Sequence, residues 1–190
     1  MIFGQLGAQA EQKRLYAQMQ QARSFRAAQR WPDLRAEDFD AILLPGGHAQ
    51  GMQQYLESTS LRHIVAEMMR LDRPVAVICH GVIVLARTQL DASGKSALRG
   101  RRVTGLPKYM ERVAYWLTAW KLGRYYRTYP AYVEAEVRAA VADTGRFERG
   151  PIRVFARGTD AEDRAAFVVE DGNLIAARWP GDAWHLAKGF

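Results

Sequence analysis

The fold expected for this chain depends on the stretch Pro74-Val-Ala-Val-Ile-Cys-His-Gly-Val-Ile-Val-Leu-Ala86. Val75–Ile78 is a short apolar run rich in β-branched residues, which is typical of a strand buried on both faces. Gly81 marks a sharp change of direction, and the apolar residues from Val82 to Leu90 then predict a buried helix. Cys79 therefore falls on a turn between strand and helix, which is the arrangement of a nucleophile elbow.

Cys79 is the first candidate catalytic residue. A turn of this kind presents a side chain at the carboxyl end of a central strand, near backbone N–H groups and the positive end of a helix. A thiol held there is expected to ionise more easily than a free one, and the thiolate is the reactive form. The alternative is a small buried hydrophobic residue, the usual fate of a single cysteine. The adjacent His80 favours the reactive interpretation.

A second loop follows the strand expected over residues 41–44. It reads Pro45-Gly-Gly-His48, and two adjacent glycines let a backbone approach a ligand or leave N–H groups pointing into a pocket. The alternative is a tight turn. In a mostly parallel sheet the site lies at the carboxyl ends of the strands, so Gly46 and Gly47 are expected beside Cys79. Their N–H groups would then hold an oxyanion.

The remaining segments alternate between helical and strand patterns. Asp171-Gly172 is a strong hairpin signal between two strands, and Asp182 is a candidate N-cap for a last short helix. This alternation predicts a single α/β domain over residues 1–190, a three-layer sandwich with a mostly parallel sheet. Helices are expected within residues 4–28, 61–71, 108–122 and 132–141, and strands within 101–104, 152–156 and 167–177.

Composition is that of a globular protein. Of 190 residues, 48% are hydrophobic and 25% are charged, and no apolar run approaches the length of a membrane span. The N-terminus lacks the pattern of a signal peptide. A single cysteine excludes an internal disulfide framework and fits a reducing compartment, so a cytoplasmic location is expected.

The net charge of +7 raises the possibility of nucleic acid binding. The basic residues are mostly arginines scattered among acidic ones, with denser clusters at Arg99–Arg102 and Lys121–Arg127. No zinc-finger spacing, RNA-binding aromatic signature or basic zipper accompanies them. A solvated basic surface is therefore favoured, and nucleic acid binding is the weakest hypothesis.

Several motifs together resemble one known family. Leu43-Leu-Pro-Gly-Gly-His48, Val77-Ile-Cys-His-Gly81, and Asp171-Gly-Asn-Leu-Ile175 followed by Trp179-Pro-Gly181 occur in the order and spacing of the ThiJ/PfpI superfamily. These are class I glutamine amidotransferase-like domains, and the resemblance implies a flavodoxin-like sandwich. It covers the chain from about Phe39 onward.

Within the superfamily the chain looks most like the heat-shock chaperones with glyoxalase III activity. That branch uses the Cys-His pair of the elbow and a later carboxylate, so the resemblance implies roles for Cys79 and His80. The segment matching the carboxylate is Thr104-Gly-Leu-Pro-Lys-Tyr-Met-Glu111, which assigns Glu111. Without the resemblance, Glu111 would be interpreted as a first-turn acid favoured by the helix dipole.

The chain departs from the family pattern in two places. His185-Leu-Ala187 stands where glutamine amidotransferases carry a His-x-Glu pair, so their standard triad is not expected, and His185 is expected to be a packing or surface residue. Family members also begin with a strand, a helix and a strand before the region matching Gly4–Trp31. The domain is therefore expected to be shortened at its N-terminus, leaving a sheet edge that favours a homodimer.

The resemblance implies an enzyme that converts methylglyoxal or glyoxal to the hydroxy acid without glutathione, cofactor or metal. The Cys79 thiolate would attack the aldehyde, and the N–H groups of Gly46 and Gly47 would hold the oxyanion. His80 would move the proton between carbons, and Glu111 would orient and stabilise His80.

Other functions remain open at this point. The same thiolate suits hydrolysis of an amide or an early glycation adduct. A non-enzymatic stress chaperone would use Cys79 as an oxidation sensor and the aromatic residues of Tyr125–Tyr132 to bind partners. A positive charge at Arg178 or Lys108 would favour a carboxylate-bearing substrate.

Overall fold

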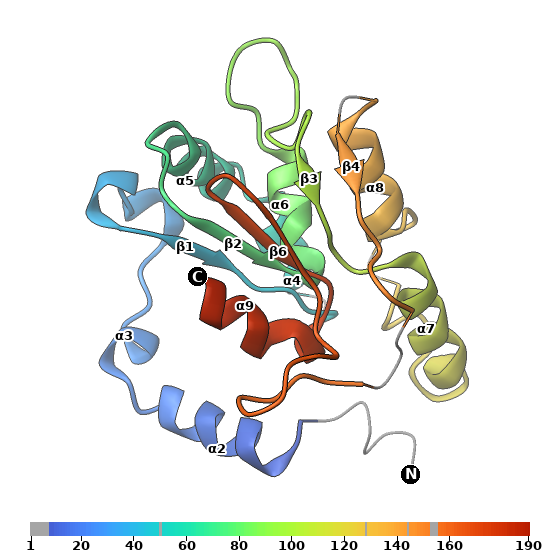
Figure 1. The fold of residues 1–190 in the computed structure, drawn as a ribbon. Helices are drawn as coiled ribbons and strands as arrows, with labels where there is room; N and C mark the ends of the chain where they lie inside the picture. The colour runs from blue at the N-terminus through green and yellow to red at the C-terminus, as the bar shows by residue number, and fades with distance from the viewer. Residues whose placement is uncertain (1–7, 50, 128, 144, 153–155) are drawn as a thin grey trace. The chain divides into compact units, whose positions relative to one another are not determined.

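The computed structural model describes residues 8–49, 51–127, 129–143, 145–152 and 156–190 (Figure 1). The chain divides into two compact units, residues 1–34 and residues 35–190, and the expectation of one domain over residues 1–190 stays a prediction. No helix in the described ranges is long and apolar enough to cross a membrane.

The smaller unit contains two helices, α2 (Ala10–Met19) and α3 (Arg23–Arg26), followed by a 3₁₀ turn at Trp31–Asp33. One helix was expected within residues 4–28, of which residues 4–7 lie outside the described part. The helix is instead interrupted after Met19, and neither helix contains a buried residue. Few apolar residues are available to bury in a segment that is rich in Gln, Ala and Arg.

The larger unit is built on a four-stranded sheet in the order β1 (Ile42–Leu44), β2 (Val75–Ile78), β6 (Leu174–Ala177) and β5 (Val168–Asp171). β1, β2 and β6 run parallel, and β5 pairs antiparallel with β6. Gly172 in the connecting turn has φ +57°, a conformation that suits glycine, so the predicted hairpin is confirmed. The mostly parallel α/β sheet is also as predicted.

A second, two-stranded parallel sheet pairs β3 (Arg102–Val103) with β4 (Arg146–Phe147). The strand expected within residues 101–104 is therefore present, although it is short. β4 was not predicted from the sequence. The strand expected over residues 152–156 falls largely on residues 153–155, which lie outside the described residues.

Helices cover both faces of the main sheet, as a flavodoxin-like sandwich requires. Leu186 of α9 (Ala183–Gly189) packs on one face with Ala76, Ile175 and Ala177. Because side chains alternate along a strand, Val75 and Val77 face the opposite side. α5 (Thr59–Arg70) contacts β2 and α6 there (Figure 1). The other helices are α4 (Met52–Glu57), α6 (Val82–Arg87), α7 (Lys108–Leu122) and α8 (Val133–Val141).

The expected helices are present, with two local differences. α6 ends at Arg87 rather than Leu90, because Thr88 adopts an extended backbone. α7 has the predicted bounds, but Trp120 at the end of its expected apolar face is 77% exposed. The last apolar residue of this face is therefore not covered by the rest of the larger unit.

Asp182 does not cap α9 with its side chain, contrary to the sequence-based expectation. Its carboxylate instead accepts two hydrogen bonds from the Arg178 guanidinium, at 2.9 and 3.0 Å, and one from the Phe167 N–H at 3.0 Å. Both members of this pair are fully buried. The buried arginine is a stronger partner for the carboxylate than the helix N–H groups. Arg178 is consequently not available to bind a substrate.

Candidate active site

The turn after β2 has the geometry of a nucleophile elbow. Cys79 has φ +60°, a left-handed conformation that costs an ordinary L-residue roughly 1–2 kcal/mol. A 3₁₀ turn over Cys79–Gly81 then leads directly into α6. A Cβ on Gly81 would collide with the backbone of Leu44, so the elbow packs tightly against the end of β1. The surrounding sheet thus holds Cys79 in a strained backbone conformation.

The Pro45–His48 loop meets the elbow at Gly46. A Cβ on Gly46 would lie 2.6 Å from Cys79 Cβ and 2.7 Å from the His80 backbone nitrogen, so only glycine fits there. Gly47 lies toward α4, where a Cβ would be 3.2 Å from Met52 Sδ. Gly46 is therefore beside the thiol, as expected for neighbouring parallel strands. The oxyanion-binding role of the two glycines stays a prediction.

Cys79, His80 and Glu111 form a continuous row of buried side chains. Cys79 Sγ lies 3.5 Å from His80 Nδ1, and His80 Nε2 lies 4.0 Å from Glu111 Oε1. The first turn of α7 positions Glu111, and its Oε2 accepts a hydrogen bond of 2.9 Å from the Val133 N–H. The three residues chosen from the sequence therefore come together, although their catalytic roles are predictions.

His48 is a fourth member of this cluster that the sequence analysis did not assign. Its ring packs edge-on against the rings of His80 and Tyr126, with centroid distances of 4.5 and 4.7 Å. Its Nδ1 atom is buried and has no hydrogen-bond partner among the described residues. The sequence could have identified His48 from its position directly after Gly46-Gly47, since this loop follows a strand that neighbours the elbow.

The same cluster contains the residue types that bind a soft divalent metal. Ligand atoms of His48, Cys79 and His80 all lie within 4.8 Å of one another. Zinc with ligand bonds of about 2.0 and 2.3 Å needs a tetrahedral N–S separation of about 3.5 Å, which the Cys79–His80 pair already has. His48 would need to move closer. With that movement, these three residues would fit zinc.

Burial dominates the electrostatics of the thiol. It raises the pKa of Cys79 to about 12, although a hydrogen bond from the His80 backbone lowers it, and the charge of Glu111 raises it further. The sequence suggested the opposite, a thiol that ionises easily. That expectation is wrong for this site, because loss of hydration opposes the thiolate more strongly than the elbow stabilises it.

The other groups of the site are shifted in the same way. Burial lowers the pKa of His48 to about 4, and burial with the nearby His48 lowers that of His80 to about 3. Burial raises the pKa of Glu111 to about 7 against the opposing effects of the Val133 N–H and Arg127. Near neutral pH the thiol and both imidazoles are therefore uncharged, and Glu111 is a stronger base than His80.

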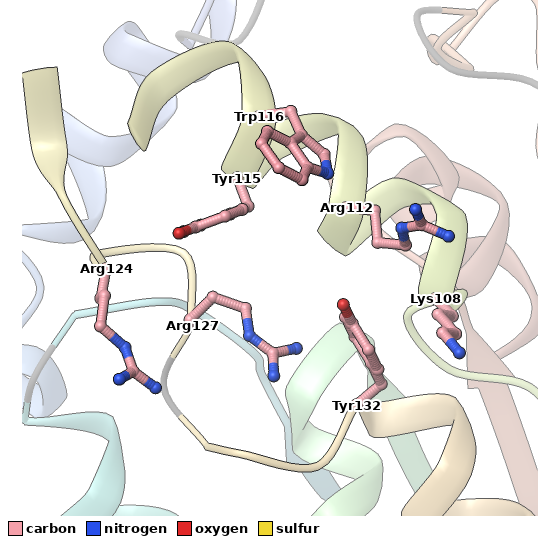
Figure 2. Close-up of a pocket in the computed structure, with 7 residues that line it drawn as sticks. All are labelled: Lys108, Arg112, Tyr115, Trp116, Arg124, Arg127 and Tyr132. Atoms are coloured by element: carbon pink, nitrogen blue, oxygen red, sulfur yellow. The ribbon is translucent and has the colours of Figure 1, made fainter. Parts of the chain in front are cut away.

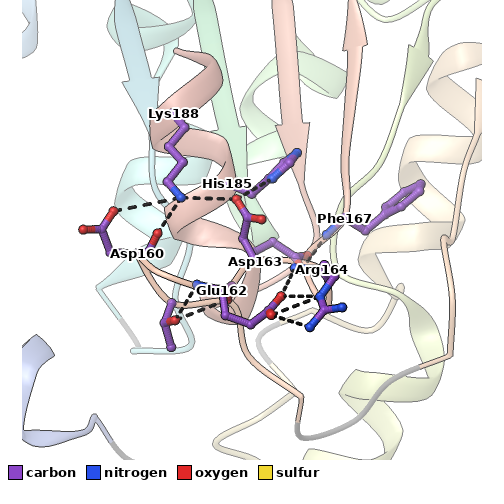
Figure 3. Close-up of polar contacts among 9 residues, drawn as sticks. Asp160, Glu162, Asp163, Arg164, Phe167, His185 and Lys188 are labelled. Atoms are coloured by element: carbon purple, nitrogen blue, oxygen red, sulfur yellow. Dashed lines mark hydrogen bonds and ion pairs between the residues drawn. The ribbon is translucent and has the colours of Figure 1, made fainter.

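His185 is separate from this cluster, as the sequence indicated. It lies on α9, and its Nδ1 is 3.0 Å from Asp163 Oδ2 (Figure 3). Lys188 of the same helix also reaches that carboxylate, at 3.4 Å. The His185 side chain is 44% exposed. It belongs to a surface network of polar contacts, and the expectation of a surface residue is confirmed.

Comparison with known proteins agrees with this geometry. A family model described as ThiJ/PfpI family-like matches residues 3–151, most of the chain including the elbow, the Gly46 loop and Glu111. This chain belongs to the ThiJ/PfpI-like family. The family assignment rests on the whole matched region and does not by itself assign an activity.

Individual ThiJ/PfpI relatives show how far the similarity extends. The chain is 27% identical over 158 residues, 83% of its length, to a deglycase from Pyrococcus abyssi, and it covers 64% of that protein. It is 36% identical over 85 residues to protein DJ-1 homolog D from Arabidopsis thaliana, which is 44% of this chain and 19% of the relative. The chain therefore spans less than two thirds of the length of either curated relative.

The solved structure of glyoxalase III from Candida albicans has the same fold. The TM-score is 0.68 at 18% sequence identity, over 95% of this chain and 68% of that one. At this identity the likeness concerns the fold alone. This chain and that solved structure therefore share the flavodoxin-like architecture.

Proposed function

We propose that this protein is a cysteine-dependent enzyme acting on small reactive carbonyl compounds, with a glyoxalase III-like conversion of methylglyoxal to lactate without glutathione. The observation that carries the proposal is the buried row of Cys79, His80 and Glu111 beside the Gly46 backbone. The fold shared with a glyoxalase III supports it.

The reaction is an internal oxidation and reduction followed by hydrolysis. Cys79 sulfur bonds to the aldehyde carbon, giving a hemithioacetal whose oxygen receives the thiol proton. A base then removes the proton from the carbon that is bonded to sulfur and delivers a proton to the neighbouring ketone carbon. At the same time the hydroxyl proton of the hemithioacetal is transferred to the ketone oxygen. The sulfur-bonded carbon thereby becomes a carbonyl, and the ketone becomes an alcohol. The product is a lactate thioester. Water then hydrolyses it to lactate and the free thiol.

In this proposal His80 moves these protons. Its Nδ1 is 3.5 Å from the sulfur, so it lies close to any carbon bonded to that sulfur. Glu111 is a stronger base than His80. We therefore propose that when His80 accepts a proton at Nδ1, it gives its Nε2 proton to Glu111. His80 then stays neutral in its buried surroundings, where an imidazolium is disfavoured.

A second candidate activity is hydrolysis of an early glycation adduct or an amide by the same thiol. It is favoured by the similarity to the Pyrococcus deglycase over 83% of this chain. A redox-sensing role is less favoured, since a buried thiol with a raised pKa oxidises slowly. A chaperone role would rely on the aromatic residues of Tyr125–Tyr132, of which Tyr125 is 44% exposed.

The proposal also includes a cytoplasmic homodimer. β1 is an edge strand of the described sheet, and Leu43 in it is 51% exposed, which favours pairing with another chain. Size-exclusion chromatography with light scattering measures the oligomeric state. A monomer at micromolar concentration would contradict this part.

The decisive experiment measures lactate formed from methylglyoxal without glutathione. Wild type is compared with Cys79→Ala and Glu111→Gln, and Glu162→Gln serves as a control because Glu162 is exposed and lies outside the site. We expect turnover that Cys79→Ala abolishes, that Glu111→Gln lowers at least about 100-fold, and that the control retains. A folded wild type without turnover would overturn the glyoxalase assignment, and release of free amine from a glycated amino acid would then support the second activity.

A further inference from the structure

A basic cavity of about 390 Å³ lies beside the candidate active site, between α7 and the loop that follows it (Figure 2). This volume is in the range of small-molecule sites. Lys108 and Arg112 reach it from α7, and Arg124 and Arg127 reach it from the loop. No acidic residue lines it, so four positive charges are gathered around one cavity.

These cations differ from the other arginines nearby. Arg87 and Arg138 pair with Glu136 and Glu134, whereas none of the four cations of the cavity forms an ion pair with a described residue. No carboxylate lines the cavity, although the buried Glu111 lies close enough to Arg127 to feel its charge. Gathering four cations around one cavity is unfavourable unless an anion is present. The cavity is therefore suited to an anionic ligand.

Arg127 gives the most specific indication. Its Nη2 donates to the Pro130 carbonyl at 2.6 Å, whereas its Nη1 is buried and has no acceptor among the described residues. An unsatisfied buried N–H group costs roughly 1–3 kcal/mol, more when it is charged. An oxygen of a bound anion would satisfy it. Arginine is also the residue type that binds phosphate with two parallel hydrogen bonds.

The rest of the lining is aromatic. It consists of Tyr115, Trp116 and Tyr132. The ring of Tyr132 lies 5.1 Å from Lys108 Nζ and 4.0 Å from the Arg127 guanidinium carbon, so it helps to hold both cations at the cavity. Trp116 is 70% exposed, which leaves its ring accessible for stacking.

We propose that this cavity binds an aromatic phosphate, with the phosphate at Arg127 and its neighbouring cations and the ring against Trp116. The site is distinct from the thiol, because Cys79 and His80 do not line the cavity. The two are nevertheless linked through Glu111, which lies between Lys108 and Arg112 on α7 and accepts a hydrogen bond from Val133, next to Tyr132. The proposal does not depend on the carbonyl activity.

The test measures binding in the Cys79→Ala protein, so that no turnover is needed. Phenyl phosphate, benzoate and inorganic phosphate are titrated by calorimetry and by tryptophan fluorescence. We expect one saturable site, tightest for phenyl phosphate, and at least about tenfold weaker binding in Arg127→Gln. Trp116→Phe should remove the fluorescence change while binding persists in calorimetry.

Arg99→Gln is the matched control, because Arg99 is exposed, lies outside the cavity and carries the same charge. The affinity of this variant for phenyl phosphate should stay within about twofold of that of the Cys79→Ala protein, since only the overall charge of the protein is altered. Equal weakening in Arg99→Gln and Arg127→Gln, or no saturable binding at all, would overturn the proposal. Benzoate binding more tightly would overturn the phosphate assignment, and inorganic phosphate binding as tightly as phenyl phosphate would overturn the aromatic part.

Discussion

His80 Nε2 and Glu111 Oε1 lie 4.0 Å apart, and both side chains are at least 96% buried. This distance is longer than a hydrogen bond, so in the protein without substrate the two groups are close but not joined. Catalytic hydrogen bonds often tighten only when the substrate is bound. Since the thiol and both imidazoles are uncharged near neutral pH, the protonation of Glu111 sets the charge of this buried cluster.

The activity is expected to depend on the ionisation of Glu111. Since burial raises its pKa to about 7, kcat/KM should rise as the pH increases through about 7, where the carboxyl group becomes a base. Rates of methylglyoxal consumption between pH 5 and 9 test this, at fixed ionic strength. In Glu111→Gln the residual rate should lose that inflection. An unchanged inflection in this variant would assign it to another group.

Glu111 should also lower the stability of the protein at neutral and alkaline pH. Its folded pKa lies above the ordinary value of 4.5, so the folded state binds more protons between pH 4.5 and 7. The contribution of Glu111 to the free energy of unfolding is largest below pH 4.5 and is lost as the pH rises through about 7. Glu111→Gln should be more stable than wild type by about 3 kcal/mol at pH 8 and similar to it at pH 4.5.

Urea unfolding at the two pH values measures this difference. Comparing variant with wild type at each pH cancels the contributions of His48 and His80, whose lowered pKa values favour stability at higher pH. Glu162→Gln is again the control. A stability difference that does not change with pH would contradict the raised pKa of Glu111.

Cys79 should react slowly with thiol reagents in the folded protein. Only the thiolate reacts, and burial raises the pKa of this thiol to about 12. At pH 7.5 its rate with a disulfide reagent should be at least about 100-fold below that of a free cysteine. Denaturant should restore the ordinary rate. Fast labelling of the folded protein would show instead that the thiolate is stabilised.

Gly46→Ala should damage the elbow, whereas Gly51→Ala should not. A Cβ at Gly46 would lie 2.6 Å from Cys79 Cβ, and nothing lies within 4 Å of a Cβ at Gly51. We expect Gly46→Ala to lose about 1–3 kcal/mol of stability together with activity. Gly51 has φ −62°, which alanine adopts easily, so its variant should match or slightly exceed wild type. Thermal unfolding and the lactate assay measure both effects.

Local sequence patterns were sufficient for most of the fold. The β-branched run of Val75–Ile78, the Pro45–His48 loop and the Asp171-Gly172 turn each place a strand or turn by short-range chemistry, and the structure has all three. β4 was missed because two residues, Arg146–Phe147, carry no readable alternation. Asp182 was expected to cap a helix, but its carboxylate binds Arg178 instead. No local sequence pattern reveals that this arginine is buried.

For the candidate site, the sequence by itself determined that a cysteine and an adjacent histidine lie at the turn after β2, because an elbow is a local turn. Only the tertiary structure brought His48 against His80, turned Glu111 toward the same ring, and gathered the cations around Arg127. It also decided the ionisation of Cys79. The cost of charging a thiol depends on how much water and how many charges surround it, and those are set by packing between segments distant in the sequence.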